Sequence, residues 1–162
     1  MKNKLFIIVF MTIWSVGTFA QNAFSSLSQM ETECLGVEED GSQTVRAWGL
    51  GRNKSDAVEQ AKKNAVSDVI FKGIKAGVAG CNMRPLLSEV NAREKYEDYF
   101  NIFFMDGGEY KKYISMADQK VRSKNKAKNK IGARYGVTLR VLRAELKARL
   151  KEDGLIKEIK AI

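Results

Sequence analysis

The sequence contains no histidine. Without an imidazole the chain cannot assemble a Ser-His-Asp or Cys-His nucleophile system, and every zinc site with a histidine ligand is excluded. The two cysteines, Cys34 and Cys81, are far apart in the sequence and too few to hold a structural zinc ion by themselves. We therefore predict a non-enzymatic protein with no catalytic residues, no cofactor and no metal site.

Carboxylates alone can catalyse glycoside hydrolysis, so a small hydrolase stays open as the least favoured alternative. The clustered acids fall at 38–40 and 97–98, in a predicted turn and on the polar side of a predicted helix. Both positions expose carboxylates to water, and neither offers the apolar surroundings that raise the pKa of a general acid.

Long hydrophobic runs are scarce, and the one near the start of the chain has the organisation of a cleavable secretory signal peptide. Two lysines precede the uncharged run Leu5–Val16, and Thr18–Ala20 supplies the small residues that a signal peptidase accepts. The run is too short for a bilayer core, which needs about 20 apolar residues. We predict a signal peptide over 1–20, a flexible lead-in over 21–30, and an exported protein without a transmembrane segment. Its location would be periplasmic, outer-membrane associated or secreted.

Export would place the cysteines in an oxidising compartment, where disulfides persist. Two cysteines allow a single intramolecular pairing, Cys34 with Cys81, but their separation in space does not follow from the sequence. A disulfide and a pair of buried thiols are therefore both open at this point.

Periodicity predicts an α+β domain of the order ββα(α)ββα, with one antiparallel sheet and the helices packed on one of its faces. The domain extends over 31–154 and is followed by a short tail over 155–162. The outer face of the sheet would be partly wet, which suits three arginines, Arg46, Arg134 and Arg140. The predicted strands lie at 31–37, 43–50, 113–122 and 133–141, and the predicted helices at 53–74, 90–104 and 142–153.

Gly49-Leu50-Gly51 joins a predicted strand to a predicted helix capped by Asn53, which invites comparison with phosphate-binding loops. The dinucleotide fingerprint requires a third glycine where this chain has Lys54, and the Gly-Lys-Ser/Thr of a P-loop is missing. A tight strand-to-helix turn is the better interpretation. The helix carries small residues four positions apart, Ala57, Ala61 and Ala65, which would let it lie close to a sheet.

The predicted helix over 90–104 carries an aromatic stripe at helical spacing. Its members are Tyr96, Tyr99, Phe100, Phe103 and Phe104. A helix that faces a sheet needs such a stripe for the core, so we favour this interpretation over an apolar ligand pocket. Tyr110 and Tyr113 would extend the same cluster.

The basic residues are concentrated in one segment of a chain with a net charge of +9. Six of them recur at every second position: Lys120, Arg122, Lys124, Lys126, Lys128 and Lys130. On an extended strand this period places all six on one face, although no aromatic residue is interleaved with them. The stripe predicts a hairpin arm that binds an anionic polymer, and a solvated hairpin tip is the alternative.

The run Val45–Gly51, a strand that ends in Gly-x-Gly and enters an alanine-rich helix, resembles the small lipoprotein-20 family. It is similar also to the N-terminal domain of flagellar assembly protein T, and the strand and helix over 135–150 fit the same pattern. The resemblance implies a bacterial envelope protein of α+β fold that works by binding or assembly, with no catalytic residues. This chain departs from the lipoprotein pattern because it lacks the lipid-acceptor cysteine after the apolar run; its first cysteine is Cys34.

The mature protein has two candidate functions on these observations. The first is a non-enzymatic envelope domain that binds a protein partner or supports an envelope assembly, which rests on the export signal, the missing catalytic groups and the resemblance. The alternative is a basic module that binds nucleic acid, lipopolysaccharide or polysaccharide through the hairpin Lys120–Lys130.

Overall fold

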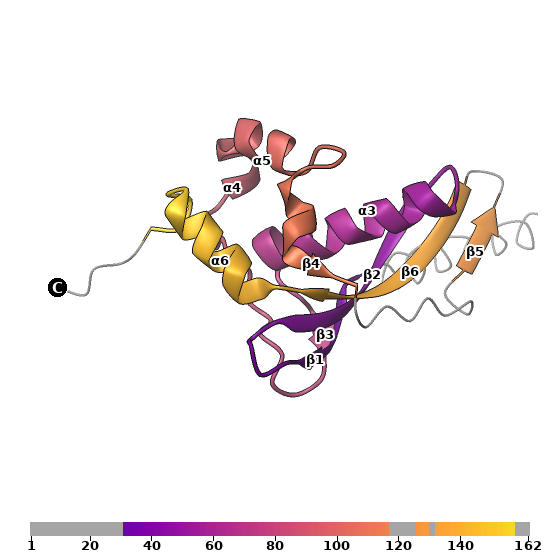
Figure 1. Ribbon diagram of the computed structural model, residues 1–162, viewed down its shortest axis with the longest axis horizontal. Coiled ribbons are helices and arrows are strands. Elements are labelled where there is room, and N and C mark those ends of the chain that lie inside the picture. Colours follow the sequence, from indigo (N-terminus) through magenta and orange to yellow (C-terminus); the bar gives the residue numbers. More distant parts are fainter. Residues whose placement is uncertain (1–30, 117–125, 130–131, 158–162) are drawn as a thin grey trace, which may run out of the picture. The chain divides into compact units, whose positions relative to one another are not determined.

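The computed structural model describes residues 31–116, 126–129 and 132–157 (Figure 1). The predicted signal peptide over 1–20 and the lead-in over 21–30 lie outside these residues, so both stay predictions. None of the helices in the described ranges combines the length and the hydrophobicity that a membrane span requires.

The first two strands form the antiparallel hairpin that the sequence predicts. β1 (Glu33–Val37) pairs with β2 (Gln43–Gly51). The turn between them holds Gly41 at a φ of 78°, a left-handed conformation that glycine adopts without strain. Asp40 stabilises the turn, because its carboxylate accepts hydrogen bonds from the amide and the hydroxyl of Ser42 at 2.8 and 2.5 Å.

β6 (Gly132–Val141) runs through the sheet and pairs with β2 along almost its whole length. Its other edge pairs with β4 (Ile114–Ser115) and β5 (Lys126–Asn129), both antiparallel. β3 (Ala76–Gly77) joins β1 in parallel. In the described part of the chain, six strands thus form one mixed sheet, ordered β3-β1-β2-β6-β4 with β5 beside β6.

Two details of the predicted sheet are wrong. The sheet is not wholly antiparallel, because the chain leaves its first long helix at Gly73 and runs alongside β1 as the short parallel strand β3. The strand predicted over 113–122 starts one residue late, because Tyr113 still belongs to a 3-10 helix, and among residues 113–116 it comprises the two residues of β4. Residues 117–122 of that prediction lie outside the described ranges.

α3 (Lys54–Ser67) covers one face of the sheet. Asn53 caps this helix as predicted, because its side-chain oxygen accepts a hydrogen bond from the amide of Asp56 at 3.0 Å. The helix continues as a π-helix over Asp68–Lys72 and ends at Gly73, whose φ is 72°. Its small residues are fully buried: Ala57, Ala61 and Ala65.

The two glycines before α3 allow this close approach. A Cβ atom on Gly49 would lie 2.0 Å from the carbonyl oxygen of Ala57 and 2.3 Å from the amide nitrogen of Ala61. A Cβ atom on Gly51 would lie 2.4 Å from the amide nitrogen of Ala57. Because the backbone of α3 fills this space, Gly49 and Gly51 act in packing, which agrees with the tight-turn interpretation.

The helix predicted over 90–104 is broken into α4 (Ala92–Lys95) and α5 (Glu97–Phe103). The break lies at Tyr96, whose φ and ψ of −114° and 33° are not helical. No glycine or proline marks this position in the sequence. The hydroxyl of Tyr96 instead donates to the carboxylate of Glu89 at 3.3 Å, a contact that periodicity does not reveal.

Two members of the aromatic stripe belong to the core, and the other three, Tyr96, Tyr99 and Phe104, are partly buried and pack against it. Phe100 and Phe103 are at most 4% exposed. Tyr113, at the end of the 3-10 helix η2 (Glu109–Tyr113), stacks on Phe103 with ring centres 5.9 Å apart. Phe71 meets Phe100 edge-on at 4.6 Å. These contacts bind the second half of the chain to the end of the long helix.

α6 (Arg143–Glu152) follows β6 directly and ends before Gly154, whose φ is 76°. Figure 1 shows α3, α4, α5 and α6 on the same side of the sheet. The side chains that β2 and β6 direct toward these helices are fully buried: Val45, Ala47, Val137, Leu139 and Val141. The predicted α+β class, with the helices on one face of a sheet, is therefore confirmed.

Cys34 and Cys81 form a disulfide with an S–S distance of 2.07 Å, which confirms the pairing considered from the sequence. The side-chain amide of Gln43 lies 3.6 Å from the Cys34 sulfur and donates to the carbonyl oxygen of Asn82 at 3.2 Å. The disulfide therefore links the segment after β3 to β1. A disulfide is compatible with an exported protein.

Candidate anion-binding site at one end of the sheet

The predicted basic stripe lies only partly within the described residues. Four of its members fall outside them: Lys120, Arg122, Lys124 and Lys130. The other two belong to β5, where Lys126 pairs with Tyr135 and Lys128 pairs with Ala133. Backbone pairing therefore joins the described part of the predicted arm to β6, and β6 separates it from β2 at this end of the sheet.

Trp48 and Arg134 form a cation–aromatic pair on the outward face of this end. Trp48 alternates with buried neighbours in β2 and lies opposite Gly136 of β6. Arg134 lies opposite Leu50 on the same face, and its guanidinium is 5.1 Å from the centre of the indole ring. At this distance the cation is attracted by the negative face of the ring.

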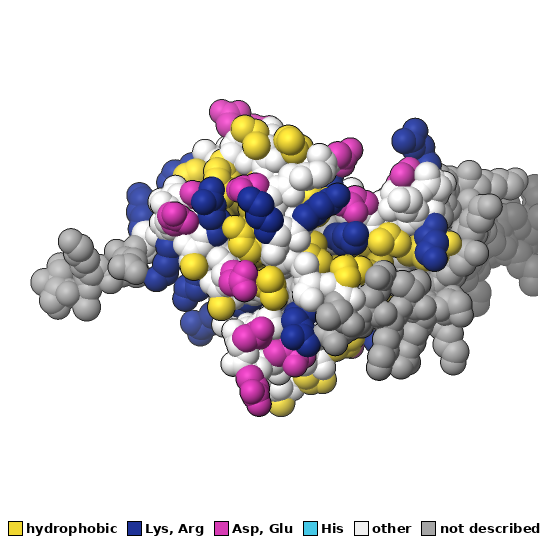
Figure 2. Space-filling model, in the orientation of Figure 1, with side chains coloured by type: hydrophobic (Ala, Val, Ile, Leu, Met, Phe, Trp, Pro, Cys, Tyr) yellow, Lys and Arg dark blue, Asp and Glu magenta, His cyan; other side chains and the backbone are white. Residues whose placement is uncertain are grey.

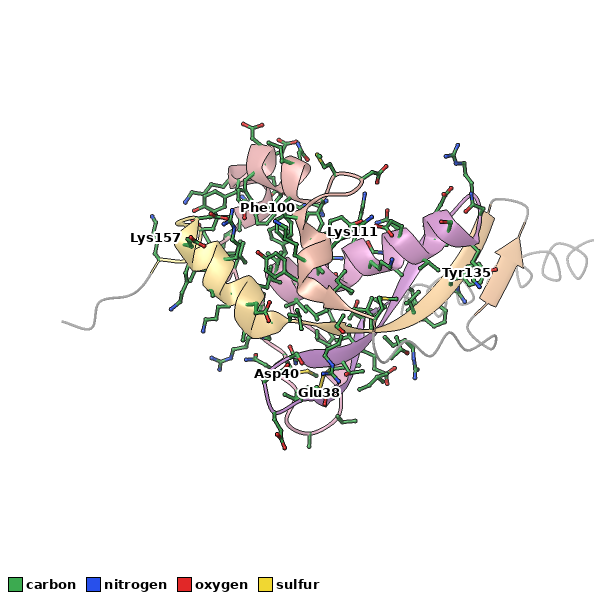
Figure 3. The ribbon with its side chains drawn as sticks, viewed as in Figure 1. Glu38, Asp40, Phe100, Lys111, Tyr135 and Lys157 are labelled. Carbon is green, nitrogen blue, oxygen red and sulfur yellow. A yellow bond between two sulfur atoms is a disulfide. The ribbon has the colours of Figure 1, made fainter. Side chains whose placement is uncertain are left out.

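A second pair, Lys54 with Tyr135, lies on the other face of the sheet. Tyr135 is the next residue after Arg134 in β6, so the two side chains point to opposite faces. Figure 3 shows Tyr135 at this end of β6, close to the start of α3. The ammonium of Lys54, the first residue of α3, lies 5.9 Å from the centre of the Tyr135 ring.

We call Trp48, Arg52, Lys54, Arg134 and Tyr135 the basic end. The side chain of Arg52 is 95% exposed and pairs with Asp56 at 3.4 Å. Among the described residues, no carboxylate forms an ion pair with Lys54 or Arg134. The basic end is therefore positively charged even before the predicted arm is included.

The other two arginines of the outward face are paired. Arg46 contacts Glu33 at 3.1 Å and Arg140 contacts Glu38 at 3.5 Å. All three predicted arginines lie on this face and are partly exposed, which confirms the prediction of a partly wet face. An anionic ligand would have to displace a carboxylate at Arg46 and Arg140, but not at Arg134.

A polar groove of about 470 Å³ leads from Arg52 along α3. Beyond Arg52 its cations are engaged in ion pairs, Lys63 with Asp106 at 2.7 Å and Lys111 with Glu59 at 3.0 Å. Figures 2 and 3 agree with this, because basic and acidic side chains are interspersed on this side and Lys111 lies beside α3. The ion pairs of the groove connect α3 to η2. The groove has fewer unpaired cations for an anion than the basic end has.

Glu59 is the carboxylate that organises the groove. Partial burial raises its pKa, but hydrogen bonds from Tyr110, Lys111 and Lys62 outweigh burial and lower the pKa to about 2. Burial and the bond to Glu59 conversely raise the pKa of the Tyr110 phenol. A carboxylate with so low a pKa is ionised at neutral pH and unsuited to general acid catalysis.

The clustered acids also lack the properties of a catalytic pair. Hydrogen bonds from the hydroxyl and the amide of Ser42 lower the pKa of Asp40. Glu97 and Asp98 lie on the exposed side of α5, as predicted. In the parts of the chain that the structure describes, no group of three or more acidic or cysteine side chains could hold a metal ion.

Comparison with other proteins gives a plain result. No family model matches the chain, and neither does any curated protein or solved structure. The resemblance to the lipoprotein-20 family therefore stays a prediction, and function has to be argued from the basic end itself.

Sequence reasoning missed the aromatic half of this site. Lys120–Lys130 contains no aromatic residue, and the aromatic rings of the basic end come from other parts of the sequence. Strand pairing places Tyr135 opposite Lys126 of β5, and Trp48 lies one strand further on, in β2 opposite Gly136. The available signal was the alternation in β2, which places Trp48 on the wet face of the sheet although the core does not need it there.

Proposed function

We propose that this protein is an exported, non-enzymatic binding module that holds an anionic polymer at the basic end. The observation that carries the proposal is the pair of cations Lys54 and Arg134. Each lies beside an aromatic ring, without a carboxylate partner among the described residues, where β5 joins β6. The predicted arm Lys120–Lys130 is the other half of the proposed site.

A polymer fits this arrangement better than a small ion does. The cations lie on both faces of β6 and converge on no cavity, so no single small anion can contact them together. A polyanion can contact them one after another, and each contact contributes by releasing counterions. The aromatic rings add stacking that tolerates variation in the ligand. The disulfide supports a location outside the cytoplasm, which we propose to be periplasmic, outer-membrane associated or secreted.

The salt dependence of binding to polyphosphate tests the proposal. Replacing both cations, Lys54→Gln with Arg134→Gln, should weaken binding about tenfold at low salt. The slope of log K against log salt should become shallower by roughly 1.4, since each phosphate contact contributes about 0.7 for a single-stranded polyanion.

The matched control is Lys95→Gln with Lys147→Gln, which removes the same charge from α4 and α6. Figure 1 shows both helices well away from β5 and the start of α3. The control should leave the affinity and the slope unchanged. Equal effects of the two double variants would mean that binding follows net charge alone, and the basic end would not be the site.

A protein partner in the cell envelope is the second candidate function. The observation that favours it is the exposure of two apolar side chains at α5, Ile102 at 67% and Met105 at 56%. Figure 2 shows exposed apolar side chains over this part of the molecule, and such surfaces commonly contact other proteins. A photocrosslinker at position 102 should give one adduct in cells, and Met105→Lys should abolish it. Recovery of the uncrosslinked protein alone would count against a partner at this surface.

A further inference from the structure

Trp48 occupies a position that the core does not require. The core uses the other face of β2, where Val45 and Ala47 are fully buried. On the outward face the cross-strand neighbour of Trp48 is Gly136, which has no side chain to cover the indole. A large, partly exposed aromatic ring beside bare backbone on a polar face is a surface on which a flat ligand group can pack.

Arg134 adds an anion-binding group at a fixed distance from that surface. A guanidinium presents parallel N–H donors that match the two oxygens of a carboxylate. Its carbon atom lies 5.1 Å from the centre of the Trp48 ring. A ligand that uses both groups must therefore carry an anion within a few ångströms of a ring, which excludes polyanions that have no rings.

Acidic sugars meet this requirement, because a uronic acid carries its carboxylate directly on a ring whose C–H face is apolar. We infer that Trp48 and Arg134 recognise a sugar unit of an acidic polysaccharide, Trp48 by packing against the ring and Arg134 by pairing with the carboxylate. The inference rests on the proposed function and names the class of polymer. The disulfide favours a polysaccharide over nucleic acid, since it indicates an oxidising compartment.

Three polyanions of matched charge distinguish recognition of a sugar ring from recognition of charge alone or of a nucleobase. They are polygalacturonate, polyphosphate and an oligothymidylate. Isothermal titration calorimetry with the full chain gives the affinity for each. Trp48→Ala should weaken polygalacturonate binding about tenfold, the order of one aromatic stacking contact, and leave polyphosphate binding within about twofold. Arg134→Lys keeps the charge but not the paired donors, so it should weaken polygalacturonate binding about fivefold and spare polyphosphate.

Lys95 and Tyr96 provide a matched control, because they form another cation–aromatic pair, 5.1 Å apart, outside the basic end. Tyr96→Ala should change neither affinity. Thermal unfolding of each variant checks that the fold is intact, which Trp48→Ala should preserve because Trp48 lies outside the core.

The outcomes differ for the two proposals. Equal losses for polygalacturonate and polyphosphate in Trp48→Ala would overturn sugar recognition and leave the anion site standing. Tighter, Trp48-dependent binding of the oligothymidylate would replace the sugar by a nucleobase. Failure of all three polymers to bind would overturn the proposed function itself.

Discussion

Reduction of the disulfide should destabilise the protein by an amount that the structure allows us to work out. The bond joins residues 47 positions apart, Cys34 in β1 and Cys81 after β3. In the chain-entropy account, a cross-link over a loop of this length stabilises the folded state by about 4 kcal/mol. The free energy of unfolding of a folded domain is only about 5–15 kcal/mol, so the loss would be a large fraction of the stability.

Urea unfolding followed by circular dichroism, with and without reductant, measures this difference. The double variant Cys34→Ala with Cys81→Ala is the control, because reductant should not change its midpoint. It also loses packing around the fully buried Cys34, so the comparison of oxidised and reduced wild type is the cleaner one. A difference below about 1 kcal/mol would show that the loop is already restricted in the unfolded chain and refute the entropic reasoning.

Three further predictions concern packing and charge. Gly49→Ala should cost roughly 3 kcal/mol or fail to fold, because its Cβ atom would meet the backbone of α3, whereas Gly36→Ala, with open space around it, should cost little in the same unfolding assay. The lowered pKa of Glu59 stabilises the folded state above pH 4.5, and acid titration of stability should show roughly 2 to 3 kcal/mol lost as the pH falls from about 4.5 to 2. Glu59→Gln should flatten that profile, and an unchanged profile would mean that other groups carry the acid sensitivity. Arg143 is only 8% exposed and donates to the Arg84 carbonyl oxygen at 2.7 Å. Because the cost of burying the guanidinium offsets what this hydrogen bond contributes, Arg143→Met should change the free energy of unfolding by less than about 1 kcal/mol. A loss above about 3 kcal/mol would contradict this reasoning.

The regular parts of the fold could be predicted because they depend on local patterns. Alternation in β2 and β6 identified the buried faces, and the cap at Asn53 and the alanine stripe identified the start and the packing face of α3. In each case the signal lies within a few residues of the structure it specifies, and burial of one face enforces it.

The remaining features depend on contacts between distant residues. The break at Tyr96 accompanies a hydrogen bond to Glu89, and β3 exists because the chain returns beside β1 near the disulfide. β4 and β5 pair with β6 in two different registers, with Ser115 opposite Arg140 and Lys126 opposite Tyr135. Alternation along a single strand carries no information about register, so sequence reasoning could not join the arm to Tyr135.

The fluorescence of Trp48 tests the central claim most directly. The chain has two tryptophans, and Trp14 lies in the predicted signal peptide, so the emission of the mature protein reports on Trp48 alone. Titration with polyphosphate should change the Trp48 emission in a saturable way, since the ligand engages Arg134 beside the ring, and added salt should reverse the change. Binding that is detected by calorimetry but leaves the Trp48 emission unchanged would place the polymer elsewhere on the protein and contradict the account.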